Sequence, residues 1–329
     1  MEPIRWGILG AGVIADLVGA DIASSPGSEI VAVAARDASR AEAFAAARGI
    51  PRSYGSYAEL VADPDVDVVY IATTHAQHHE HALLALRAGK PVLVEKAFTL
   101  NARQAREVVA EARARNLFCM EAMWTRLNPL LRQAVALTEG GAIGDVLAVR
   151  ADLSKLFPYD PTHRLYDLAA GGGALLDLGV YPATVVWMFL GRPDEVQALG
   201  TLAPTGADVT VSQQWRYDRG PIAQLFCTAA GPSPFGGLIN GSDGWISIEQ
   251  RLHRPDQIVV HRGSDTEVIK EDPIPGNGYL LEVQEVERCL RERRTESENI
   301  PLDDTIAILE VLDEVRRQLG VRYPADELE

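Results

Sequence analysis

The sequence contains few cysteines, and no two of them lie close together. Cys119, Cys227 and Cys289 have neither a CxxC partner nor a neighbouring histidine. This spacing excludes a disulfide framework and a zinc ribbon, and it is typical of buried thiols in a reducing compartment. The sequence also has no run of about 18 apolar residues and no signal-peptide pattern at its N-terminus. We therefore expect a cytoplasmic protein that does not enter a membrane.

Basic residues are also in short supply. Lys and Arg total 31 against 46 Asp and Glu, which gives a net charge of −15. This charge disfavours nucleic acids and anionic membranes as partners, although one basic pocket would still hold a single phosphate. With 47% apolar and 23% charged residues over 329 positions, the chain is typical of a folded protein of about two domains.

Short apolar runs alternate with amphipathic stretches at the start of the chain. The apolar runs are residues 4–10, 30–35, 66–73, 91–96 and 117–121. Continuous apolar runs are typical of strands buried on both faces, and the amphipathic stretches between them predict helices. This α/β rhythm predicts a doubly wound parallel sheet in a first domain, residues 1–124.

The pattern changes after residue 124. Between 195 and 271 the sequence alternates apolar and polar residues between turns, so that every second residue of 208–217 shares one strand face. We expect an α+β second domain, residues 125–329, built on an open, mainly antiparallel sheet with helices on one face. Asp303 would cap a last helix, 303–319, that packs back on the first domain.

A glycine-rich turn lies between the first apolar run and the first helix. Gly10, Gly12 and Ala15 form a G-x-G-x-x-A pattern there. Gly10 permits the tight turn, Gly12 lets the backbone approach a pyrophosphate, and Ala15 allows close packing of helix on strand. The first helical turn, with Val13 and Ile14, offers its N–H groups to the anion. An ordinary glycine turn is the alternative, but strand, turn and helix in this order favour dinucleotide binding in a Rossmann domain.

The end of the second strand bears on which dinucleotide binds. An acidic residue there would bond a ribose 2′-hydroxyl, whereas an arginine would pair with a 2′-phosphate. Arg36 takes this position, and Ser39 and Arg40 follow within one turn. We therefore favour NADP over NAD. The alternative is a solvated surface on which Asp37 only caps the next helix.

Four histidines, His75, His78, His79 and His81, lie close together in sequence. Two of them at i, i+3 on a helix would be able to chelate a metal. No nearby cysteine or set of carboxylates completes such a site, so we expect no metal.

Four segments of the chain match a known family. They are GAGVIA (10–15), THAQHHEHALLALRAGKPVLVEKAF (74–98), EAMWTRLNP (121–129) and GGGALLDLGVY (171–181). On these segments the chain resembles the Gfo/Idh/MocA oxidoreductases, named after glucose–fructose oxidoreductase, inositol dehydrogenase and a rhizopine-catabolism protein. It is most similar to the branch that contains dimeric dihydrodiol dehydrogenases, NADP-dependent xylose dehydrogenases and glucose–fructose oxidoreductase. The family most often has Pro after the Glu-Lys pair, where this chain has Ala97.

The resemblance implies that Lys96, Asp177 and Tyr181 are catalytic. Lys96 would polarise the reacting oxygen, and its charge would make Tyr181 a better proton donor and acceptor. Many family members have histidine where this chain has Tyr181; the tyrosine is typical of the branch just named. The alternatives are a surface lysine and a core tyrosine whose hydroxyl bonds Asp177.

The resemblance also places further residues along the cofactor. Thr73, Thr74, His75 and His78 would line it, and Glu95 would lie on its nicotinamide side. Trp124, Arg126 and Arg164 would line the cofactor or substrate cleft, although each also fits a packed aromatic or a paired surface arginine.

These residues lead to an expected reaction. We expect hydride transfer between the nicotinamide of NADP and a carbon that bears a hydroxyl or carbonyl group, on a small polyhydroxylated substrate: a sugar, an inositol or a cyclic diol. A catalytically inactive NADP-binding sensor and a sugar-binding module without cofactor are the alternatives. We also expect a homo-oligomer, most simply a dimer formed through the second domain's sheet.

Overall fold

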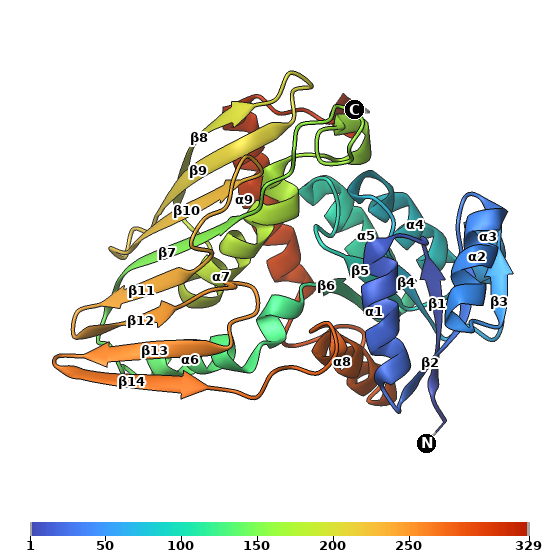
Figure 1. The fold of residues 1–329 in the computed structure, drawn as a ribbon, viewed down its shortest axis with the longest axis horizontal. Helices are drawn as coiled ribbons and strands as arrows, with labels where there is room; N and C mark the ends of the chain where they lie inside the picture. Colours follow the sequence, from blue (N-terminus) through green and yellow to red (C-terminus); the bar gives the residue numbers. More distant parts are fainter. Residues whose placement is uncertain (1, 328–329) are drawn as a thin grey trace. The chain divides into compact units, whose positions relative to one another are not determined.

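The computed structural model describes residues 2–327, which divide into two compact units (Figure 1). One unit is the chain up to Trp124 together with Ile274–Ile306. The other is Thr125–Pro273 together with the chain from Ala307. The expected boundaries did not include the return of 274–306 to the first unit. The units are described separately below.

The first unit is built on a parallel sheet of six strands in the order β3-β2-β1-β4-β5-β6. The order reverses between β1 and β4, which is the position where open α/β sheets bind ligands. The strands are β1 (Ile4–Leu9), β2 (Ser28–Ala34), β3 (Arg52–Tyr54), β4 (Val68–Ile71), β5 (Val92–Glu95) and β6 (Cys119–Ala122). The helices are α1 (Val13–Ser24), α2 (Ala38–Arg48), α3 (Tyr57–Ala62), α4 (His75–Arg87), α5 (Ala102–Arg115) and α8 (Leu280–Arg291). The predicted parallel, doubly wound sheet is confirmed.

Polar contacts to buried side chains hold the segment 274–306 in the first unit. The carboxylate of Asp21 in α1 accepts hydrogen bonds from the backbone N–H groups of Asn277 (2.9 Å) and Tyr279 (2.8 Å). The Ser25 hydroxyl donates to Glu287 of α8 at 2.5 Å. An amphipathic pattern reports a helix but not the unit that its apolar face meets, so these contacts were not visible in the sequence.

The second unit is built on an eight-stranded sheet in the order β14-β13-β12-β11-β7-β10-β9-β8. All neighbours are antiparallel except β10 and β7, so the expected mainly antiparallel sheet is confirmed. Its strands are β7 (Val146–Ser154), β8 (Glu195–Leu202), β9 (Asp208–Arg216), β10 (Ile222–Thr228), β11 (Gly237–Gly241), β12 (Gly244–Ile248), β13 (Gln257–Arg262) and β14 (Asp265–Lys270).

Helices cover one face of this sheet. A π-helical turn, Leu175–Gly179, continues directly into α7 (Val180–Leu190), and the two pack on β7 and β10. In addition, α6 (Pro129–Glu139) packs on β13 (Figure 1). On β9, Val211, Gln213 and Trp215 are buried whereas Ser212 and Gln214 are exposed, as the alternating pattern predicts.

One segment of the second unit is apolar enough to cross a membrane by length and composition. It is Leu168–Leu190, and 89% of its most apolar 18-residue window is buried inside the protein. Burial of this extent is typical of the core helix of a globular domain.

Helices α2 and α5 begin at residue types that favour N-caps. Asn101 caps α5 by accepting from Gln104 N (2.9 Å), and Asp37 caps α2. Asp303, expected as a cap, lies instead in the first turn of α9 (Leu302–Leu319), because Pro301 precedes the helix and its carbonyl accepts from the N–H groups of residues 304 and 305.

Candidate functional site

The glycine-rich turn has the backbone geometry that an anion site needs. Gly10 has φ +108°, and a Cβ there would lie 2.6 Å from the carbonyl oxygen of Ala72, so only glycine fits without strain. Gly12 at the start of α1 faces open space and has no side chain to cap the helix. Val13 is 79% exposed, and Ile14 is half-buried. The first amides of α1 are therefore left for an external acceptor such as the diphosphate of a dinucleotide.

The residues after β2 lie at the surface beside this turn. Arg36, Ser39 and Arg40 are all exposed. Asp37 accepts from both the backbone N–H and the hydroxyl of Ser39 (2.9 and 2.8 Å), and these hydrogen bonds lower the pKa of Asp37. Arg40 reaches back to the carbonyl of Ala11 in the glycine turn at 3.2 Å. Asp37 therefore caps the helix, while Arg40 contacts the turn and Arg36 is exposed two residues after β2.

The end of β4 carries the threonines and histidines of the cofactor prediction. Thr73 and Thr74 are half-buried, and Thr73 Oγ1 lies 3.0 Å from His81 Nδ1. His78 is fully buried, with Nδ1 2.9 Å from the carbonyl of Ala97 and Nε2 3.1 Å from that of Thr73. Burial lowers its pKa to about 4. His78 thus links the ends of β4 and β5.

The other histidines do not assemble a metal site. His75 is buried with its ring 5.6 Å from that of His78, and His79 lies 2.7 Å from Glu107 at the surface. Among residues 2–327 no group of three or more His, Cys, Asp or Glu side chains has the geometry of a metal site.

The end of β5 carries the Glu-Lys pair. Glu95 is buried and accepts a 2.5 Å hydrogen bond from the Tyr70 hydroxyl of β4. Burial raises the pKa of Glu95 to about 7, although the hydrogen bond from Tyr70 and the charge of Lys96 both lower it. Lys96 itself is half-buried. Trp124, also in this unit, is buried with its ring 4.7 Å from that of Tyr279.

The second unit holds the other two predicted catalytic residues. Asp177 lies in the π-helical turn and Tyr181 in the first turn of α7, and both are more than 90% buried. Arg164, half of whose side chain is exposed, lies 3.1 Å from the carboxylate of Asp177. The ring of His253 lies 5.2 Å from that of Tyr181. π-helical turns occur often at functional sites.

The glycine run positions this helix. A Cβ at Gly172 would overlap the carbonyls of Arg164, Leu165 and Asp167 (2.6 to 2.8 Å), and a Cβ at Gly173 would overlap the Asp208 carboxylate. Asp208 also accepts from the N–H of Leu175 at 2.6 Å. Burial raises the pKa of Asp208 to about 6, although this hydrogen bond lowers it. The run therefore lets the chain pass two tight contacts before the helix begins.

Several residues of these sites were not predicted. Tyr70 reads as one more apolar strand residue, and Asp208 begins a strand 31 positions after Asp177. His253 lies in a connection without a motif. Arg126, which was predicted to line the cleft, is half-buried in a 3-10 turn, Trp124–Leu127.

Two family models match the chain. Residues 4–123 match an oxidoreductase family with an NAD-binding Rossmann fold, and residues 131–247 match the GFO/IDH/MocA C-terminal domain. Trans-1,2-dihydrobenzene-1,2-diol dehydrogenase of Mus musculus is 40% identical over 98% of this chain and 99% of its own length, and that of Bos taurus is 38% identical over the same shares.

Several solved structures of oxidoreductases have a fold similar to that of this chain. KijD10, a 3-ketoreductase from Actinomadura kijaniata in complex with NADP and TDP-benzene, has a TM-score of 0.86 and 26% identity over 96% of this chain and 98% of its own. An aldose-aldose oxidoreductase from Caulobacter crescentus has a TM-score of 0.88 at 22% identity, covering 97% and 98% of the two chains. A levoglucosan dehydrogenase solved with NADH and levoglucosan has a TM-score of 0.85 at 22% identity, over the same shares.

Proposed function

Because this chain belongs to the Gfo/Idh/MocA oxidoreductase family, we propose that it is an NADP-dependent dehydrogenase that oxidises one hydroxyl group of a vicinal diol on a small ring. The family makes it an NAD(P)-dependent oxidoreductase that acts at hydroxyl and carbonyl carbons, which leaves the inactive sensor without support. The observation that carries the finer proposal is the identity of 40% over 98% of the chain to a trans-dihydrodiol dehydrogenase.

Lys96, Tyr181 and Asp177 divide the proton chemistry in this proposal. The nicotinamide, when bound, accepts the hydride. The ammonium group of Lys96 holds the reacting oxygen and stabilises the charge that develops on it. The phenolate oxygen of Tyr181 takes the proton of the substrate hydroxyl, and the positive charge of Lys96 favours this deprotonated form. Asp177, tied to Arg164, orients the substrate or its neighbours.

The preference for NADP rests on the exposed arginines after β2. Arg40 already contacts the glycine turn, and Arg36 lies two residues after the end of the strand. Two guanidinium groups suit a 2′-phosphate, and the carboxylate of Asp37, the acidic residue nearby, is engaged by Ser39. The cofactor site would be completed by Thr73, Thr74, His75, Glu95 and Trp124. His78 would keep the ends of β4 and β5 in place through its contacts with the carbonyls of Thr73 and Ala97.

The substrate proposal is tested with a panel. Trans-cyclohexane-1,2-diol, cis-cyclohexane-1,2-diol, inositol and several aldoses are offered with NADP and with NAD, and turnover is followed at the nicotinamide absorbance. Preference for the trans diol with NADP supports the proposal. Equal rates on open-chain alcohols, or turnover with NAD alone, would refute it.

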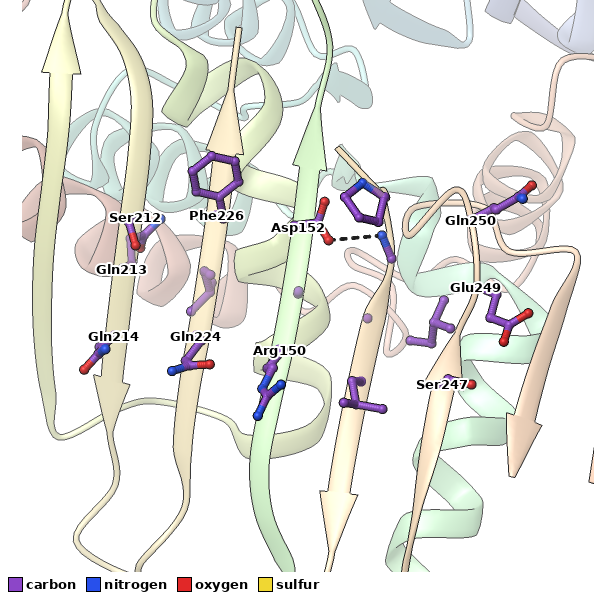
Figure 2. A pocket seen from close by; sticks show the side chains of 17 residues that line it. Arg150, Asp152, Ser212, Gln213, Gln214, Gln224, Phe226, Ser247, Glu249 and Gln250 are labelled. Atoms are coloured by element: carbon purple, nitrogen blue, oxygen red, sulfur yellow. Dashed lines mark hydrogen bonds between the residues drawn. The ribbon is translucent and has the colours of Figure 1, made fainter. Parts of the chain in front are cut away.

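The outer face of the eight-stranded sheet supports a homodimer. Leu199, Ser212 and Phe226 form one cross-strand row there, and Leu199 is 80% exposed. Ser212 and Phe226 also line a hollow of about 950 Å³. Figure 2 shows these two side chains together with polar lining residues such as Arg150 and Gln224. Exposed leucine and phenylalanine among polar groups are typical of an interface. A second copy would cover this face in a closed two-fold dimer.

A further inference from the structure

A buried carboxyl group in the first unit has no partner. Glu282 of α8 is 0% exposed, and neither of its carboxyl oxygens has a hydrogen-bond partner within residues 2–327. A carboxylate in such surroundings loses its hydration without a hydrogen bond or ion pair to replace it, which is among the most costly arrangements for a charged group. The structure therefore raises the question of which form of Glu282 is present.

The titratable groups that act on Glu282 or are acted on by it come from three elements: the carboxyl groups of Glu95 in β5 and Asp21 in α1, and the phenol of Tyr70 in β4. Tyr279, just before α8, acts on Tyr70 as well. Asp21 is already bonded to the backbone N–H groups of residues 277 and 279. The positive charge of Lys96 lowers the pKa of Glu95. Both charged groups that act most strongly on Glu282 are thus acidic, and burial together with their charge raises its pKa well above the usual range.

Glu95 and Glu282 differ in what stabilises their charge. Glu95 has a hydroxyl donor at 2.5 Å and a lysine beside it, whereas Glu282 has neither. When two carboxyl groups share one buried site, the repulsion between them keeps a proton on one of the two. The group with the poorer partners keeps that proton.

We infer that Glu282 carries a proton in the folded protein, so that Glu95, which has the Tyr70 hydroxyl as donor, is the member of this buried acid pair that ionises. Glu282 then adds no second negative charge to the surroundings of Glu95. The role of the pair in tuning Lys96 rests on the proposed function, whereas the protonation of Glu282 does not.

The same helix provides a matched control. Glu285, three residues later, is also buried, but it accepts hydrogen bonds from Arg288, Ser297 and Asn299. Burial alone would raise its pKa, and these bonds lower it to about 2. Glu282 and Glu285 thus represent opposite cases on one helix.

The first test compares the thermal unfolding midpoints of wild type, Glu282→Gln and Glu285→Gln from pH 4 to pH 8, without substrate. The contribution of Glu282 to the stability of wild type falls as the pH rises past about 4.3, the pKa of an unfolded glutamate, because folding must then return a proton to Glu282. Glu282→Gln lacks this loss, so its midpoint relative to wild type should rise by several degrees toward pH 8. Glu285→Gln should fall below wild type over the same range. A fall for both variants would overturn the inference.

The second measurement needs no variant to fold. pH 8 lies above the pKa values of Glu95 and Asp208, so these two groups are ionised there. The infrared carbonyl band of a buried carboxylic acid should remain at this pH in wild type and vanish in Glu282→Gln. If Glu282→Gln does not fold, wild type alone decides: a spectrum without this band at pH 8 refutes the inference.

The third measurement addresses Lys96. Glu95→Gln removes the charge behind the lysine and should move the alkaline limb of kcat/KM to lower pH by about one unit. Glu282→Gln should move it much less, because it replaces a neutral group by another. Equal shifts in the two variants would show that Glu282 is charged. A further outcome is that the infrared and stability experiments give the expected results while Glu95→Gln leaves the alkaline limb of kcat/KM unchanged. That outcome would refute the effect of Glu95 on the pKa of Lys96, and the protonation of Glu282 would still hold.

Discussion

The guanidinium group of Arg164 lies 3.1 Å from the carboxylate of Asp177, and the two residues come from a loop and a π-helical turn. Arg164 is half exposed whereas Asp177 is buried, so the arginine extends from the surface to a charge that would otherwise lack water. The pair gives the conformation of the loop before the glycine run a direct effect on the helix that carries Tyr181.

Arg164→Ala should lower both stability and activity. Loss of the partner leaves the Asp177 carboxylate less well satisfied, which we expect to cost about 1 kcal/mol because half of the arginine is solvated. Chemical denaturation measures this cost, and steady-state kinetics should show a larger loss in kcat/KM than stability alone explains. Arg164→Lys should recover part of it. A variant with wild-type kinetics would mean that the pair is only structural.

Tyr181→Phe should lower kcat by about 100- to 10,000-fold, the usual contribution of a general acid or base. NADPH affinity, measured by fluorescence titration, should remain close to wild type because the hydroxyl acts on the substrate. Lys96→Ala should be at least as damaging, since it removes both an oxygen contact and the charge that tunes the tyrosine. Wild-type turnover in Tyr181→Phe would assign the proton transfer to Asp177 or to water.

Arg36→Ala should remove most of the preference for NADPH over NADH. One charge-assisted contact to a phosphate is worth roughly 1.5 to 3 kcal/mol, or about 10- to 150-fold in Kd. Arg48→Ala, which removes another exposed arginine of the same unit, is the control. The assignment fails if wild type binds NADH as tightly as NADPH.

Leu199→Asp combined with Phe226→Asp should convert a dimer into a monomer at micromolar concentration. Charges placed on the outer face of the sheet would be desolvated in the interface. Light scattering measures the mass, and Leu156→Asp, in a loop with 57% exposure, is the control. A monomeric wild type would contradict the proposed dimer directly.

Asp208→Asn should change the pH dependence of stability. Because the folded pKa of Asp208 is raised to about 6, its contribution is fully present below the unfolded value of about 3.9 and is lost as the pH rises through 6. The variant should therefore gain on wild type by about 2 to 3 kcal/mol between pH 4 and pH 7. Denaturation curves at several pH values measure the difference. A constant difference would show that Asp208 is ionised throughout this range.

The sequence alone determined the features that depend on local geometry. Buried strands, helix starts such as Asn101, and the turn at Gly10 follow from residue type and spacing, because each is decided within a few positions of the chain. The prediction that Lys96, Asp177 and Tyr181 are catalytic came instead from the resemblance to the family.

The tertiary structure decided which distant groups meet. Asp208 lies against the turn at Gly173, and the segment 274–306 returns to the first unit. The charge of Glu95 acts on Glu282 although 187 positions of sequence separate the two residues. Periodicity shows that a residue is buried but not beside what, since the same apolar face packs against any complementary surface. For a carboxyl group the neighbours decide whether it is charged, and this is why the different states of Glu282 and Glu285, so close on one helix, emerge only from the folded chain.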